Sequence, residues 1–256
     1  MTESNELTSK TEPAGLLNTA VNIFVAPSEA FVEIQQRPSK AIPLLVIISS
    51  MGLALFWYFN ILDYDWFVDD IIATMQEPSI SGPGLFIESG NDANDAEAVR
   101  EQMLSVSPNT FMLFSVLGGI ASSLLVFVLQ SSYLSLTTAL SGERIKFTQW
   151  FSLVIWAGLP TLLSVMGMIV TIYLSPNGQL STSDLDPLTL ANLGMQSSNA
   201  SVEQILSSLN LTMLWSLVLV IMAHRQWLGS SLLKATTIVT APYILILGIW
   251  AYFAFT

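Results

Sequence analysis

The sequence predicts an all-α integral membrane protein: a bundle of five transmembrane helices, with its N-terminus in the cytoplasm, its C-terminus outside and short interfacial helices at the N-terminus. Five apolar stretches recur along the 256 residues, each close to the roughly 20 residues that a helix needs to cross a bilayer. The hydrophobic fraction is 52% and the charged fraction only 11%, which is far below the charge content of soluble domains. The basic residues also gather in alternate connecting segments.

The distribution of basic residues predicts the orientation. One set of connecting segments carries every lysine and arginine except Arg100, which lies in the other set. Because basic segments are retained in the cytoplasm during insertion, the richer set is expected on the cytoplasmic side. Its members are Lys10, Arg37, Lys40, Arg144, Lys146, Arg225 and Lys234.

Two segments precede the first span. Residues 1–13 are polar and predict a disordered tail. Residues 14–40 predict two short helices at the cytoplasmic interface, because apolar side chains recur there at helical spacing in stretches too short to span. Pro27 separates the two and can open the second helix as its first residue. Packing beneath the bundle as ordinary cover is an equal alternative for both helices.

The membrane domain is expected over residues 41–256, with an acidic outer loop at 63–107 that contains a short helix near 92–104. The loop at 137–150 is short, so the second and third spans are expected to be antiparallel neighbours. Pro160 lies inside the third span and predicts a kink there, because proline removes a backbone hydrogen bond. The predicted spans are residues 41–62, 110–136, 151–174, 205–223 and 235–255.

No Asp, Glu, Lys, Arg or His falls within these predicted spans. Ion-coupled transporters usually carry such groups at membrane depth, so secondary transport is disfavoured. A neutral path lined by Ser and Thr stays open as an alternative. The single histidine, His224, falls at the end of the fourth span and is interpreted as an interfacial residue.

No catalytic residue, metal site or cofactor is predicted. The chain has no cysteine, and it lacks the phosphate-binding loop, the dinucleotide fingerprint, the zinc motif and the nucleophile elbow. The net charge of −11 argues against a nucleic-acid partner, because binding phosphates requires a basic surface.

Four aspartates crowd the outer end of the first span. Oxygen ligands of this kind can hold a hard divalent cation, but their spacing is not that of a calcium-binding EF-hand loop. We favour a solvated acidic edge that reinforces the topology. The residues are Asp63, Asp65, Asp69 and Asp70.

Small residues in the second span predict close helix packing. Gly118 and Ser122 are four positions apart, a spacing that lets two helix backbones approach each other in lipid. Gln130 is a lone amide in the same span and is expected to bond across to a neighbouring helix. The pattern does not distinguish an internal contact from a dimer interface.

Three segments resemble bacterial Yip-domain membrane proteins. Residues 23–46, IFVAPSEAFVEIQQRPSKAIPLLV, are similar to the opening of those proteins, in which a Phe follows a Pro by four positions and an Arg-Pro pair precedes the first span. Residues 147–164 and 209–247 resemble their third and last two spans. The resemblance covers most of residues 20–255 outside the two outer loops. It is carried by Pro27, Phe31, Arg37, Pro38, Gly158, Pro160, Trp215, Ser216, Lys234, Ala241, Pro242 and Tyr243.

This resemblance implies a non-enzymatic five-span protein. Eukaryotic members of the family associate with Rab GTPases and vesicle-coat machinery, and some bacterial members look like accessory subunits of ABC-type efflux systems that handle peptides. The Asp-Leu-Tyr-Gly-Pro motif that precedes the first span in eukaryotic members is absent here. We therefore do not carry GTPase binding over to this chain.

The leading hypothesis is a scaffold or accessory subunit of a bacterial inner membrane, in contact with the lipid bilayer and with other membrane proteins or a second copy of itself. The alternatives are a small-solute channel or transporter, and lipid or membrane-shape handling by the interfacial helices. The residues expected to dock a partner are Phe24, Pro27, Phe31, Arg37 and Pro38, and those expected in helix packing are Gly118, Ser122, Gln130 and Pro160.

Overall fold

Five helices long and apolar enough to cross a membrane dominate the computed structural model, which describes residues 15–76 and 93–255. The all-helical fold class with five such helices is therefore confirmed for this part of the chain. The spans are α3 (Ala41–Ile61), α6 (Pro108–Leu140), the pair α7 (Phe147–Ala157) and α8 (Thr161–Leu174), α10 (Leu211–Leu228) and α11 (Leu232–Phe255).

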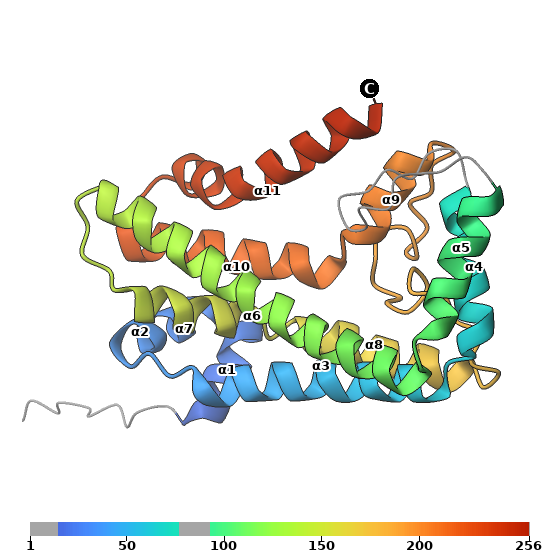
Figure 1. The fold of residues 1–256 in the computed structure, drawn as a ribbon. Helices are drawn as coiled ribbons and strands as arrows, with labels where there is room; N and C mark the ends of the chain where they lie inside the picture. The colour runs from blue at the N-terminus through green and yellow to red at the C-terminus, as the bar shows by residue number, and fades with distance from the viewer. Residues whose placement is uncertain (1–14, 77–92, 256) are drawn as a thin grey trace, which may run out of the picture.

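The connections between spans alternate between the two ends of the bundle. In Figure 1 the α6–α7 and α10–α11 connections lie at the end that holds α2 (Pro27–Gln36). The opposite end holds α4 (Tyr64–Gln76), α5 (Ala93–Ser105) and α9 (Ala200–Ser208). We call the first the basic end, because the chain segments there carry Arg37, Lys40, Arg144, Lys146, Arg225 and Lys234.

The core of the bundle forms around α7. Every residue from Ser152 to Ala157 is buried, and so is Trp150 two positions earlier. A helix that is apolar on all sides is typical of a protein core or of a membrane span. Helices α2, α3, α6 and α10 all pack against α7 and cover it.

The third span is interrupted at Pro160. Helix α7 ends at Ala157 and α8 begins at Thr161, with Pro160 in the position that precedes the first turn of α8. The amides of Leu162 and Leu163 bond three residues back, to the carbonyls of Leu159 and Pro160. Pro160 itself has no N–H to continue the helical pattern, which explains the tight turn at this point.

The fourth span lies further along the chain than the predicted residues 205–223. Helix α9 ends at Ser208, and α10 begins at Leu211. The Asn210 side chain separates them, because its Oδ1 accepts a 2.7 Å hydrogen bond from the Met213 amide and caps α10. The helix then continues to Leu228, where Gly229 takes a left-handed conformation with φ of 57°.

The acidic outer segment contains a helix that the sequence analysis did not predict. Helix α4 follows α3 directly, and the Asp63 carboxylate accepts a 3.2 Å bond from the Trp66 amide at its start. Phe67 and Val68 are buried, so α4 covers the end of the bundle with an apolar face. The second helix of this segment, α5, overlaps the helix predicted near residues 92–104.

A second, smaller core fixes the loop after α8 to the end of α3. Tyr58 packs there with Ile172, Leu180 and Leu185, and its hydroxyl donates a 2.8 Å hydrogen bond to the Leu180 carbonyl. Gly178 has a φ of +71°, and an added Cβ would collide with the Ile61 carbonyl. The loop backbone therefore approaches α3 more closely than a residue with a side chain permits.

Replacing Tyr58 with Phe is expected to lower the free energy of unfolding by about 1–2 kcal/mol, because the buried Leu180 carbonyl loses its donor. Thermal unfolding of the detergent-solubilised chain, followed by tryptophan fluorescence, measures the change. Tyr173→Phe is the control, because the Tyr173 side chain is 74% exposed. If Tyr58→Phe melts at the wild-type temperature, this bond does not hold the loop.

Candidate functional site

The N-terminal helices form a hairpin that we call the platform, residues 15–40. Helix α1 (Leu16–Val25) and α2 pack against each other on either side of Ala26, and Pro27 is the first residue of α2. The Thr19 hydroxyl donates a 2.6 Å hydrogen bond to Glu33 and joins the two helices. Ile23, Phe31 and Ile34 enter the core of the bundle, so the platform is part of the fold.

Helix α7 holds the end of α2 through its side chains. Gln149 Nε2 donates to the Gln35 carbonyl at 2.8 Å. Ser152 Oγ and Trp156 Nε1 both donate to the Ser39 carbonyl, each at 2.7 Å. The last carbonyls of a helix and those just beyond it have no partner within the helix. These three side chains therefore satisfy the backbone where the platform turns into the first span.

Helix α10 holds the rest of α2 in the same way. Gln226 Nε2 donates to the Ser28 carbonyl at 2.9 Å, and Trp227 Nε1 donates to the Phe31 carbonyl at 3.1 Å. Both donors lie in the last turn of α10, at the basic end. The platform is thus attached to the third and fourth spans through backbone carbonyls along its length.

The residues predicted to dock a partner differ in their access to one. Phe31 is fully buried, so in this structure it supports the platform from inside. Phe24 is 37% exposed and meets the Trp215 ring edge-on, with centroids 5.8 Å apart. Pro27 is half-buried, whereas Arg37 and Pro38 are exposed beyond the end of α2.

An apolar stripe follows the outer face of α1. Leu17, Val21 and Val25 are four positions apart and exposed, so they lie on one face of the helix. A short helix with such a face is suited to the boundary between headgroups and acyl chains. This is the geometry that the interfacial interpretation requires.

The predicted packing residues of α6 fall into two groups. Gly118 and Ser122 are exposed, and an added Cβ on Gly118 would meet nothing within 4 Å. The internal contact with α3 is made one position further round, where an added Cβ on Gly119 would lie 3.1 Å from Leu55. Gln130 makes a side-chain hydrogen bond with Tyr243 and so joins α6 to α11.

His224 is buried inside the protein, close to the end of the fourth span. Only 1% of it is exposed. Its ring lies 5.9 Å from the Trp150 ring, and its Nδ1 is 3.4 Å from the Ser230 hydroxyl. Because α10 extends to Leu228, His224 falls within a span, in its last turns.

Sequence reasoning missed a polar cluster where the first turn of α8 meets the first turn of α10. Asp186 Oδ2 accepts hydrogen bonds from Ser164 Oγ at 3.0 Å and from Asn210 Nδ2 at 2.8 Å, and Oδ1 accepts from the Leu188 amide. Thr212 Oγ1 lies 3.2 Å from the Ser164 hydroxyl. These bonds fasten the loop of residues 175–199 to the bundle. Asp186 and Ser164 are 22 positions apart and share no motif, so the sequence pattern did not predict the cluster.

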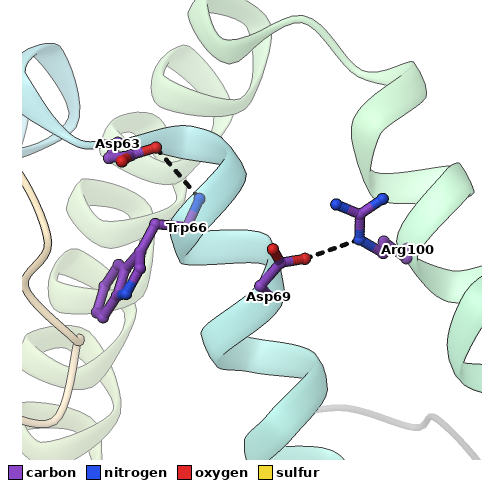
Figure 2. Close-up of polar contacts among 4 residues, drawn as sticks. All are labelled: Asp63, Trp66, Asp69 and Arg100. Carbon is purple, nitrogen blue, oxygen red and sulfur yellow. Dashed lines mark hydrogen bonds and ion pairs between the residues drawn. The ribbon is translucent and has the colours of Figure 1, made fainter.

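The aspartates near α4 do not converge on one point. Figure 2 shows Asp63 directed at the Trp66 amide and Asp69 directed at Arg100, whose Nε is 2.7 Å from the Asp69 carboxylate. This hydrogen bond raises the pKa of Arg100. Among the described residues no group of three or more histidine or acidic side chains is placed to hold a metal ion.

These features define a multi-pass, all-helical membrane protein with an N-terminal hairpin built into its core. A family model described as the Yip1 domain matches residues 21–253. The chain therefore belongs to the Yip1 domain family, whose members are generally non-enzymatic membrane proteins. Comparison with curated proteins gave no match, and comparison with solved structures gave none either.

Replacing Trp156 with Phe is expected to loosen the platform, because the Ser39 carbonyl loses one of its two donors. A lost bond worth about 1.4 kcal/mol would speed amide hydrogen exchange in residues 27–40 about tenfold. Trp57→Phe is the control, since Trp57 is exposed. Unchanged exchange in Trp156→Phe would show that the apolar contacts of Phe31 and Ile34 hold the platform without this bond.

Proposed function

We propose that this chain is a non-enzymatic scaffold or accessory subunit of a bacterial inner membrane. It binds another membrane protein, such as a subunit of an ABC-type efflux system, and uses two surfaces to do so. One is the exposed face of α6, and the other is the exposed end of the platform. The orientation inferred from the basic residues places the platform in the cytoplasm.

The observation that carries the proposal is the unpartnered face of α6. In the most apolar part of this 33-residue helix no residue is buried. In the corresponding part of α7–α8, 56% of the residues are buried. Leu117, Gly118, Ser122 and Leu125 are all exposed there. Small residues between larger apolar ones let the backbone of a second helix come close in lipid. The face therefore suits a transmembrane helix of a partner.

The platform supplies a charged counterpart outside the membrane. Arg37 and Pro38 are exposed where α2 ends, and the Lys40 ammonium group lies 5.5 Å from the centre of the Phe151 ring. Arginine recognises carboxylates through several donors at once. An acidic segment of the partner is the expected contact for Arg37.

Polar side chains in α6 support a scaffold over a solute channel. Ser131, Ser132 and Thr138 each donate a hydrogen bond to the carbonyl four residues earlier in the same helix. These hydroxyl hydrogens serve the helix backbone and are not free to replace the hydration shell of a solute. The hydrogen bonds of these side chains therefore favour a scaffold over a solute channel.

Lipid handling remains a second candidate because of the apolar stripe on α1. Deleting the platform would remove Phe31 from the core, so point changes give a cleaner test. Replacing Leu17 and Val25 with Ser should leave the melting temperature near that of the wild type, because both side chains are exposed. A change in the lipid order of reconstituted vesicles would support this candidate, and unchanged order would remove it.

Gly118→Leu is expected to weaken assembly without unfolding the chain, because the added side chain enters open space on the exposed face. Light scattering of the detergent-solubilised protein measures the size of the assembly. Gly119→Leu is the matched variant: its side chain would press on Leu55 and is expected to lower the melting temperature instead. An unchanged assembly size in Gly118→Leu would remove the claim that this face is an interface.

Crosslinking in native membranes, followed by mass spectrometry, tests the proposed partner. We expect a transporter subunit or another defined membrane complex in stoichiometric amount. Arg37→Glu should reduce its recovery, while Arg144→Glu, at another exposed position of the basic end, should not. Recovery of this chain alone would contradict the accessory role and indicate self-association.

A further inference from the structure

A hollow at the basic end lies where three helices meet. Its volume is about 450 Å³, and it is lined by the start of α2, the last turns of α10, the connecting residues and the start of α11. The lining combines polar and apolar side chains: Ser28, Met222, Arg225, Gln226, Gly229, Ser230 and Leu232.

The polar lining favours an anion. Arg225 contributes a guanidinium group, which carries its positive charge at all physiological pH values. Among the described residues no carboxylate lies within ion-pair distance of it. Ser28, Ser230 and Gln226 line the same space, and the Gln226 amide has a second N–H besides the one that it donates to the Ser28 carbonyl. These are the groups that bind phosphate oxygens in proteins.

The charges around the hollow give a net positive site. Lys234 lies in the first turn of α11, whose first residue, Leu232, lines the hollow. Glu29 follows Ser28 in the first turn of α2 and opposes the anion. Ser28 in the first turn of α2 and Leu232 at the start of α11 bring the positive ends of two helix dipoles to the hollow, while the end of α10 brings one negative end.

The apolar lining favours a phosphate that carries a hydrocarbon chain. Met222 lies one turn deeper in α10 than Arg225, and its side chain is 37% exposed; Leu232 is 57% exposed. A ligand with its phosphate at Arg225 can therefore lay a chain along Met222 toward the lipid-facing surface. Arg225 lies near the end of its span, at the depth where headgroups are found.

We propose that this hollow binds the phosphate group of an anionic phospholipid, with Arg225 as its principal contact. The inference does not depend on the proposed scaffold function, since a lipid held here is a ligand of the chain itself. The phosphate chemistry is shared with soluble phosphate compounds, so the test must separate the two sources.

The test measures lipid retention by native mass spectrometry on the full chain, purified in a non-ionic detergent. The probes are phosphatidylglycerol, phosphatidylcholine and inorganic phosphate. We expect preferential retention of phosphatidylglycerol, and a loss of about tenfold in Arg225→Gln, in line with the strength of hydrogen bonds to a charged group. Arg144→Gln is the control for general charge at the same end, because Arg144 is exposed in the α6–α7 connection.

Each outcome decides the proposal. Equal retention of both lipids, or an equal loss in Arg144→Gln, would overturn it. Inorganic phosphate that protects the chain from heat as well as the lipid does would support the phosphate site and assign it to soluble compounds. Arg225 also stabilises α10, because its positive charge lies near the negative end of the helix dipole. Arg225→Gln can therefore lower the stability of the fold as well as lipid binding. Leu232→Glu is the second variant: it adds a carboxylate at an exposed position and should abolish retention in a folded chain.

Discussion

The structure depends on the hydrogen bonds that the bundle donates to the backbone carbonyls of the platform. A carbonyl buried without a partner costs about 1–3 kcal/mol. Gln149, Ser152 and Trp156 of α7 supply donors to the Gln35 and Ser39 carbonyls. Because the same helix is buried on all sides by the spans around it, the position of α7 fixes the platform and the bundle together.

The sequence predicted the parts of this fold that depend on length and polarity. Apolar runs of spanning length identified the five long helices, and Pro160 marked the interruption of the third. The start of the fourth span was misplaced because Ile205, Leu206 and Leu209 extend the apolar stretch, and the polar residues between them, Ser207, Ser208 and Asn210, were not taken as a boundary. Only the capping bond of Asn210 shows that Ile205 and Leu206 belong to a separate helix. Helix α4 was not predicted because the aspartates make its sequence look polar. One face of the helix is nevertheless apolar, and Phe67 and Val68 on that face are buried.

The candidate sites were less predictable, since they join distant residues. Phe31 was predicted to dock a partner, whereas the structure buries it in the core that α2 shares with α7 and α10, which no local pattern reveals. His224 is buried by Trp150, from another helix. The hollow at Arg225 joins residues about 200 positions apart in the chain, from Ser28 to Leu232. Sequence periodicity describes one helix at a time, and contacts between helices lie outside its reach.

Helix α6 has a consequence for the membrane in which the chain resides. Its 33 residues correspond to a length of about 50 Å at 1.5 Å per residue, while the hydrocarbon layer is about 30 Å thick. In Figure 1 the helix runs obliquely across α3 and α7. Tilting of this kind relieves hydrophobic mismatch, at an energetic cost that changes with bilayer thickness. A thicker membrane accommodates α6 closer to upright, so the tilt of this helix is expected to respond to bilayer thickness.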